Sequence, residues 1–356
     1  MDAARARRIA GRMLMVGFPG KVLEAGAAAL LRDLHPAGII LFSRNYESLA
    51  QVTALIAAAI EAADDPQLLV AIDQEGGKVN RFTAPFTLFP GAREIGATAN
   101  DYMAYEVGKA MATELLASGV NVNLAPVLDV DSNPQNPIIG PRSFGPDPYL
   151  VSRMAMQMLS GMQDAGILAC GKHFPGHGDT SEDSHLKLPS VDHGLDRLLD
   201  VELVPFADAI DAGIDMIMTA HVVVRGVDPD CPATLSSDIL TGLLKTRMGF
   251  RGVVVTDDLE MKAIADNFGR TEAALSAVRS GADLLLVCHT ADLQVEIRDA
   301  LAAAIEKGDV GPERANDASD RVTALKKRVL RKRPDPYFIG CIEHARLAEE
   351  IRDLAC

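Results

Sequence analysis

The chain has 356 residues with 35 basic and 49 acidic side chains, so its formal net charge is −14 with histidine neutral. This charge and a pI near 5.0 argue against a protein that binds nucleic acid through a basic face, and against docking on anionic membranes. Hydrophobic residues make up 48% and charged residues 24%, a balance typical of a globular protein with a sizeable core.

Short runs rich in Val, Ile, Leu and Met recur along the chain. Their hydrophobicity is continuous, which is typical of strands buried on both faces. The predicted strands are 13–17, 38–42, 68–72, 120–127, 167–170, 216–219, 252–255 and 283–288. Amphipathic stretches rich in Ala and Leu separate them and predict helices, among them 49–63, 101–118, 151–165, 195–212 and 270–280.

This alternation of strand and helix predicts an α/β fold, specifically a single (β/α)8 TIM-type barrel, and we allow for an irregular early part of that barrel. A doubly wound open sheet is the alternative. Polar clusters at the ends of the predicted strands favour the barrel, where such ends surround one pocket. These clusters are Asp73-Gln74-Glu75, Asp129, Lys172-His173, His221 and Asp257-Asp258. No GxGxxG or GxxxxGK[ST] motif for binding phosphates is present.

The domain organisation follows from the lack of a linker or low-complexity segment. We expect residues 1–330 to form one catalytic barrel and residues 331–356 to add a flanking helix, over 342–354, to the same domain. About 25 residues cannot bury a core alone.

The expected location is the cytoplasm. No apolar run approaches the roughly 20 residues that span a bilayer, and the N-terminal segment lacks the features of a signal peptide. The five cysteines are far apart and never in CxxC spacing, which favours reduced thiols over disulfides or a thiolate zinc site.

The densest group of chemically competent residues is KHFPGHGDTSEDSHLKLP at 172–189. Gly176 and Gly178 predict a loop there rather than a helix. Asp183 and His185 stand two residues apart on it, and a carboxylate beside an imidazole suits a general acid/base at pH 7. A metal site is an alternative, although a Pro-Gly turn separates His173 from His177, unlike the HExxH helix.

Two further segments place carboxylates at strand ends. In GVVVTDDLEM (252–261), Asp257 and Asp258 directly follow an apolar run, where a carboxylate can serve as nucleophile, base or ligand. In AIDQEGGKVNRF (71–82), Asp73 follows another, and Gly76 and Gly77 would let the backbone turn tightly against a ligand.

These segments resemble family 3 glycoside hydrolases, and within them the β-N-acetylglucosaminidase branch. The resemblance runs from about residue 10 to 330. Besides the three segments above, it rests on GIILFSRNYES (38–48), APVLDV (125–130), GPRSFG (140–145) and MTAHV (218–222).

The resemblance implies retaining exo-hydrolysis of a terminal β-linked N-acetylglucosamine. In Gram-negative bacteria the branch acts in the cytoplasm on GlcNAc-1,6-anhydro-N-acetylmuramic acid and its peptide forms during peptidoglycan recycling. Asp257 matches the nucleophile and His185 the acid/base, with Asp183 as its partner. Five residues match the groups that hold the sugar: Asp73, Arg81, Arg142, Lys172 and His173.

We expect a small-molecule carbohydrate substrate, a muropeptide fragment, and infer no cofactor, no metal, no nucleic-acid or membrane partner and no obligate protein partner. The chain has no Trp and 4% aromatics, which favours a small pocket gripping one sugar over a long stacking cleft. The alternatives are a GlcNAc glycoside phosphorylase on the same scaffold, a metal-dependent barrel hydrolase and a non-catalytic sugar sensor.

Overall fold

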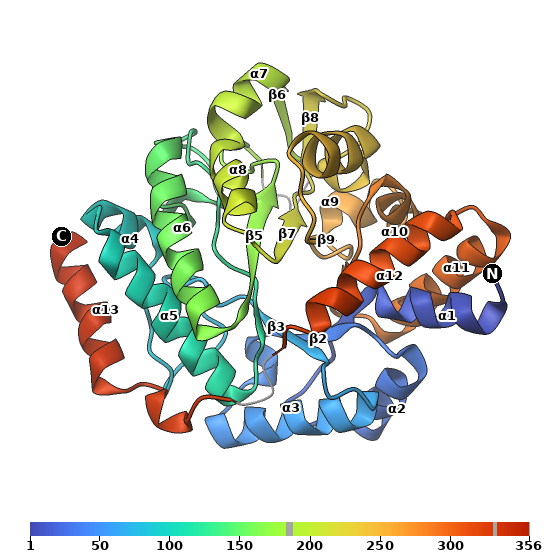
Figure 1. Cartoon of the computed structure of the whole chain (residues 1–356), viewed down its shortest axis with the longest axis horizontal. Helices are drawn as coiled ribbons and strands as arrows, with labels where there is room; N and C mark the ends of the chain where they lie inside the picture. The colour runs from blue at the N-terminus through green and yellow to red at the C-terminus, as the bar shows by residue number, and fades with distance from the viewer. Residues whose placement is uncertain (183–187, 330–332, 356) are drawn as a thin grey trace.

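The computed structural model describes residues 1–182, 188–329 and 333–355 (Figure 1). Eight parallel strands form one sheet in the order β10-β1-β2-β3-β4-β5-β7-β9. Their bounds are β1 (Leu14–Val16), β2 (Gly38–Leu41), β3 (Leu69–Ile72), β4 (Val122–Asn123), β5 (Leu168–Phe174), β7 (Met216–Thr219), β9 (Val253–Val255) and β10 (Leu285–Val287).

The two end strands of this sheet, β9 and β10, meet and close it. The backbone N–H of Leu284 donates to the carbonyl of Val254 at 3.1 Å, and that of Thr256 donates to the carbonyl of Leu284 at 3.0 Å. An open doubly wound sheet would leave these groups at separate edges, so the prediction of a (β/α)8 barrel is confirmed.

Helical segments follow every strand and surround the sheet (Figure 1). After β1 to β4 the chain forms α2 (Ala25–Leu34), η1 (Ser43–Asn45), α3 (Leu49–Ala63), α4 (Ala92–Thr98), α5 (Asp101–Ser118), η2 (Gly140–Arg142) and α6 (Pro148–Ala165). After β5 to β10 it forms α7 (Leu195–Arg197), η3 (Leu198–Glu202), α8 (Val204–Asp211), η4 (Ala233–Leu235), η5 (Asp238–Arg247), α9 (Lys262–Ala265), α10 (Arg270–Ser280), α11 (Ala291–Lys307) and α12 (Pro312–Lys326). The early part is regular, because β1 is parallel to both of its neighbours and leads into α2.

The predicted elements match these segments, with three main differences. The strand predicted over 167–170 continues to Phe174 as β5. The strand predicted over 120–127 is continuous only at Val122–Asn123. Pairing with β5 resumes at a bridge between Val127 and Lys172, and Pro126, which has no N–H to donate, lies between the two paired parts. The helix predicted over 195–212 is divided into α7, η3 and α8, and Pro205 stands in the first turn of α8, where a proline interrupts a continuing helix.

Alternate residues along the strands divide the core into two layers. One set packs inside the barrel and includes Met15, Ile40, Val122, Leu168, Cys170, Met216, Met218, Val253, Val255 and Leu286. The other set packs outward against the helices and includes Leu14, Ile39, Val70, Ile217, Val254 and Leu285. Both faces of each strand are therefore buried, which explains why the strands are continuously hydrophobic.

One end of the barrel is covered by α12. Its residues Val322 and Leu325 belong to the interior cluster, and Arg321 donates to the carbonyl of Gly252 at 2.9 Å, just before β9 begins. Because this cover lies at the amino ends of the strands, the carboxyl ends are left to form a pocket.

Five further elements add to the barrel. The helix α1 (Ala3–Arg12) packs against α11 and α12, and β6 (Ser190–Gly194) pairs in parallel with β8 (Val223–Gly226). After η6 (Pro336–Phe338), the last helix α13 (Ile342–Ala355) lies against α4 and α5 (Figure 1). There His344 Nδ1 lies 2.7 Å from a carboxylate oxygen of the buried Glu114. Within the described ranges, no helix combines the length and the apolar character needed to cross a bilayer.

Candidate active site

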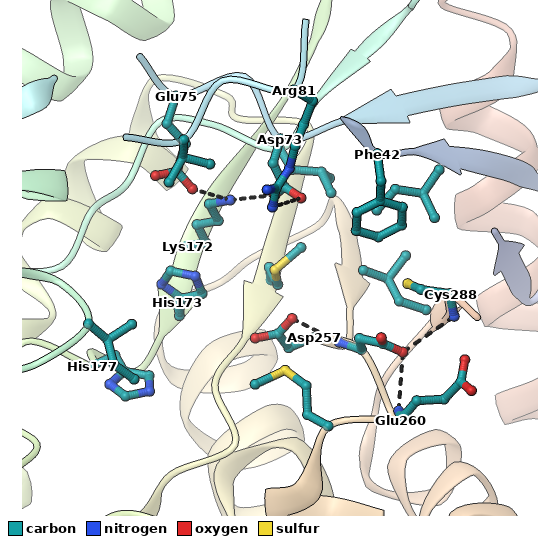
Figure 2. Close-up of a pocket in the computed structure, with 18 of the residues that line it drawn as sticks. Phe42, Asp73, Glu75, Arg81, Lys172, His173, His177, Asp257, Glu260 and Cys288 are labelled. Carbon is teal, nitrogen blue, oxygen red and sulfur yellow. Dashed lines mark hydrogen bonds and ion pairs between the residues drawn. The ribbon is translucent and has the colours of Figure 1, made fainter. Parts of the chain in front are cut away.

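A cavity of about 480 Å³ opens at the carboxyl ends of the strands (Figure 2). Loops that follow β2, β3, β5, β9 and β10 contribute to its wall, and η2 adds Arg142. The charged and polar residues on the wall include Asp73, Glu75, Arg81, Arg142, Lys172, His173, His177, Asp257, Asp258, Glu260 and His289.

Lys172, near the end of β5, joins two carboxylates that follow β3. Its Nζ lies 2.7 Å from Asp73 Oδ1 and 2.7 Å from Glu75 Oε1, and only 2% of its side chain is exposed. Arg81 approaches the other oxygen of Asp73 at 3.5 Å. A sugar hydroxyl that reaches this wall therefore meets both ionised acceptors and cationic donors.

Glu75 is held more firmly than Asp73. Arg142 binds it in a bidentate pair, with Nε and Nη2 each 2.8 Å from a carboxylate oxygen. Burial alone would raise the pKa of Glu75, but Lys172 and Arg142 outweigh burial and hold the pKa far below its ordinary value. Glu75 thus remains an anion that orients two cations toward the cavity.

Asp129, which follows β4, is fully buried behind the cavity wall. Its carboxylate accepts from the backbone N–H of His177 at 2.7 Å and lies 2.7 Å from Nδ1 of His173. Burial alone would raise its pKa, yet these two histidines lower it below the ordinary value. The opposite nitrogen of His173, Nε2, lies 3.3 Å from Nη2 of Arg142.

The neighbours Asp257 and Asp258 have different surroundings. Asp258 accepts from the backbone N–H of Glu260 at 3.1 Å and of Cys288 at 3.4 Å, and it pairs with His289 at 3.2 Å. Asp257 accepts from the N–H of Asp258 at 2.8 Å, through one of its two oxygens. The Asp258 carboxylate thus secures the turn after β9, while that of Asp257 is available to a ligand.

Asp257 stays ionised for electrostatic reasons. Burial alone would raise the pKa of its carboxyl, but the imidazoles of His221 and His173, the Asp258 amide and Lys172 together lower it below the ordinary value. Burial lowers the pKa of His221, so its ring is neutral at pH 7. His221 Nε2 lies 3.0 Å from the carbonyl of Asp258. Because a carbonyl only accepts, Nε2 carries the proton, and this hydrogen bond stabilises the turn after β9.

The rim beside β2 combines an aromatic ring with cations. The ring of Phe42 has the guanidinium of Arg44 at 4.4 Å, that of Arg81 at 5.7 Å and the imidazole of His289 at 5.4 Å. Arg44 also donates to the carbonyl of Cys288 at 2.7 Å. These contacts join the loops after β2 and β10.

The structure brings together six of the eight predicted site residues: Asp73, Arg81, Arg142, Lys172, His173 and Asp257 all line the one cavity. The predicted acid/base pair, Asp183 and His185, lies outside the described residues. Gly76 and Gly77 were predicted to turn against a ligand, but a Cβ at either would meet the backbone of Pro90 or Gly91. The tight turn at these two glycines is therefore required by the close approach of the chain's own backbone rather than by a ligand.

Several residues of the site were not assigned a role from the sequence. Glu75 and Asp129 stood in the polar clusters at strand ends, but nothing in the spacing showed that they contact Arg142 and His173. His177 was considered only as a metal ligand. Its Nδ1 lies 2.8 Å from Thr180 Oγ1, and burial, followed by His173, lowers its pKa to about 4.

In the described part of the chain, no group of three or more His, Cys, Asp or Glu side chains has an arrangement that could hold a metal ion. His173 Nδ1 faces Asp129, and His177 Nδ1 faces Thr180, so these two rings do not converge through those nitrogens.

The sequence matches the family described as Glycosyl hydrolase family 3 N terminal domain over residues 8–325. It is 41% identical over 297 residues to Beta-hexosaminidase of Xylella fastidiosa strain M23, which covers 82% of this chain and 86% of that protein. A longer relative, Beta-hexosaminidase A of Pseudoalteromonas piscicida, is 38% identical over 318 residues; the match covers 82% of this chain and 53% of that protein.

Two solved structures are similar to this one along most of its length. A glycoside hydrolase family 3 beta-N-acetylglucosaminidase from Paenibacillus sp. strain FPU-7 superposes with a TM-score of 0.93 and 43% identity, over 98% of this chain and 68% of that one. NagZ from Neisseria gonorrhoeae, solved with N-trifluoroacetyl-D-glucosamine, superposes with a TM-score of 0.83 and 34% identity, over 96% of this chain and 97% of that one.

Proposed function

This chain belongs to glycoside hydrolase family 3, and on that premise we propose that it is a retaining exo-β-N-acetylglucosaminidase with Asp257 as its nucleophile. By its relatives it is a β-N-acetylhexosaminidase. Release of a terminal β-linked N-acetylglucosamine (GlcNAc), the retaining course and the roles of individual residues are the proposal.

The observation that carries the proposal is the contrast between Asp257 and Asp258 beside a wall of charged groups. Retaining hydrolysis needs an ionised carboxylate that can attack the anomeric carbon. Asp257 is ionised, and it shares the cavity with Lys172 and Asp73, whereas the contacts of Asp258 secure its turn.

The first half-reaction follows from these groups. A terminal sugar binds with its hydroxyls against Asp73, Lys172 and Arg81, and the Asp257 carboxylate attacks its anomeric carbon as the bond to the leaving oxygen breaks. His185, whose role rests on the resemblance, donates a proton to that oxygen. Asp183 stabilises the protonated imidazole from which this proton comes. In the second half-reaction His185 takes a proton from a water molecule as the water oxygen attacks the anomeric carbon. The bond between that carbon and Asp257 then breaks, which frees the sugar and restores the carboxylate.

The size of the cavity supports exo action. About 480 Å³ accommodates one sugar with its N-acetyl group, at the lower end of the usual range for ligand pockets. We propose that the substrate is GlcNAc-1,6-anhydro-N-acetylmuramic acid or its peptide forms, and that the enzyme meets it in the cytoplasm during peptidoglycan recycling.

The test is release of p-nitrophenol from its β-N-acetylglucosaminide by wild type, Asp257→Ala and His185→Ala. The proposal predicts turnover independent of added phosphate and of EDTA, nearly abolished in Asp257→Ala and greatly slowed in His185→Ala. Turnover that requires phosphate and yields GlcNAc-1-phosphate would identify a phosphorylase instead. An inactive wild type that still binds GlcNAc would identify a sensor. The proposed recycling substrate is tested with purified anhydromuropeptide, from which the enzyme should release GlcNAc.

A further inference from the structure

Asp129 connects three chain segments that form the cavity wall. Its carboxylate accepts from the backbone and the ring of His173 on β5, and from the backbone N–H of His177 in the following loop. Its own carbonyl accepts from the hydroxyl of Ser143 at 2.7 Å, one residue after Arg142. One fully buried residue thus holds the segments that carry His173, His177 and Arg142.

The contacts of Asp129 determine which nitrogen of His173 carries a proton. An ionised carboxylate can only accept, so His173 Nδ1, 2.7 Å from Asp129 Oδ2, must be the donor. Arg142 can only donate, so Nε2, 3.3 Å from its Nη2, accepts in the neutral ring. The His173 ring is then fixed in the Nδ1–H form, with the lone pair of Nε2 on the side of Arg142 and the cavity.

We propose that Asp129 is a positioning residue of this active site: it holds His173 in the Nδ1–H tautomer, with Nε2 as the acceptor, and anchors the backbone at His177. Asp129 does not touch the substrate and acts through these two residues. The consequence for activity rests on the proposed function, whereas the tautomer of His173 does not.

The variant Asp129→Asn tests this arrangement because it preserves shape but replaces one acceptor oxygen with a donor NH2. If the remaining oxygen accepts from the His177 N–H, the NH2 faces His173 Nδ1. Nδ1 must then lose its proton and Nε2 gain it, which places two donors against each other at Arg142. If the amide is reversed, the same conflict arises at the backbone N–H of His177.

The tautomer is measured by long-range ¹H–¹⁵N correlation of the histidine rings, with the His173 signals assigned through His173→Gln. We expect the Nδ1–H form in wild type and its loss in Asp129→Asn. With p-nitrophenyl β-N-acetylglucosaminide, kcat/KM should fall about a hundredfold or more, since small displacements of positioned groups cost that much. Inhibition by GlcNAc should weaken in parallel.

A matched control is Asp131→Asn, two residues further along the same segment. Asp131 pairs with Arg93 rather than with a histidine, so its replacement should leave the His173 tautomer unchanged.

The outcomes are distinct. A wild-type His173 in the Nε2–H form overturns the proposal, and this result needs no variant to fold. An Asp129→Asn enzyme that keeps both the Nδ1–H form and kcat/KM within about threefold also overturns it. A wild type that shows the Nδ1–H form but no turnover of the glycoside would contradict the proposed function and leave the role of Asp129 supported.

Discussion

Glu75 and Arg142, 67 positions apart in the chain, form a bidentate ion pair with both N–O distances at 2.8 Å. Lys172 contacts the same carboxylate at 2.7 Å and Asp73 at 2.7 Å, so Glu75 is shared by two cations at the wall of the cavity. Removing its charge would leave Arg142 without its carboxylate partner and Lys172 with Asp73 alone, and the loss of one partner from a buried pair is strongly destabilising.

We therefore expect Glu75→Gln to lower the free energy of unfolding by about 3 to 5 kcal/mol and to weaken GlcNAc binding. Chemical denaturation and an inhibition assay measure the two effects. The control is Asp192→Asn, which removes an ion pair to Arg225 in which the two side chains are 88% and 61% exposed. Its effect should stay within about 0.5 kcal/mol. Equal stability of Glu75→Gln and wild type would contradict the role given to Glu75.

Two histidines that line the cavity, His177 and His289, should have pKa values shifted in opposite directions from the ordinary value. Burial and His173 lower the pKa of His177 to about 4, whereas the hydrogen bond to Asp258 raises the pKa of His289 above its ordinary value. An NMR titration of the histidine rings measures both. A His177 ring that protonates near pH 6.5 would contradict the buried, neutral state described here.

The low pKa of His177 also has a consequence for stability. Between its ordinary pKa of 6.5 and about 4, the unfolded chain binds a proton at this residue and the folded chain does not. The contribution of His177 to stability is therefore complete above about pH 6.5 and is lost progressively as the pH falls toward 4. In His177→Gln, the free energy of unfolding should depend less on pH across this window than in wild type.

Separate replacements of Asp257 and Asp258 should distinguish the catalytic carboxylate from the one that stabilises the turn after β9. Asp257→Asn should reduce kcat on the order of 10⁴-fold, because an amide is not an effective nucleophile. Asp258→Asn keeps an oxygen for the N–H groups of Glu260 and Cys288 but loses its charge beside His289. We expect a loss below about a hundredfold. If Asp258→Asn is the more damaging change to kcat, with folding intact in both, the assignment is reversed.

The contact between α13 and the barrel tests the prediction that residues 331–356 belong to the same domain. His344→Ala removes a partner of the buried Glu114, which still accepts from the backbone and hydroxyl of Thr87. Stability should fall by about 1 to 3 kcal/mol with one cooperative transition and unchanged kcat/KM. The exposed Arg346→Ala is the control and should behave as wild type. A second, separate transition would show that α13 is not part of the cooperative unit.

The strands could be predicted from the sequence, because parallel buried strands are continuous apolar runs. The position of the site at their carboxyl ends could also be predicted, because these ends converge in a barrel. Convergence explains why Asp73, Lys172 and Asp257, far apart in the chain, meet in one cavity. The break of the helix over 195–212 could also have been anticipated from Pro205.

The rest depends on side-chain directions that spacing does not determine. Asp257 and Asp258 are chemically identical neighbours, and only the fold shows that the N–H groups after Asp258 engage its carboxylate. Asp129 stood at a strand end like the ligand-facing residues, yet its carboxylate points behind the wall toward the backbone of His177. Whether a strand-end carboxylate faces a ligand or its own chain is decided by such tertiary contacts.

The measurement that tests the central claim most directly is chemical trapping of the glycosyl-enzyme. A 5-fluoro GlcNAc fluoride should react quickly and hydrolyse slowly, because fluorine destabilises the positively charged transition states, so the intermediate accumulates. The account predicts an adduct of one sugar per chain, located by peptide mass spectrometry on Asp257 and absent from Asp257→Ala. An adduct on another carboxylate, or substantial turnover by Asp257→Ala without any adduct in wild type, would contradict Asp257 as the nucleophile.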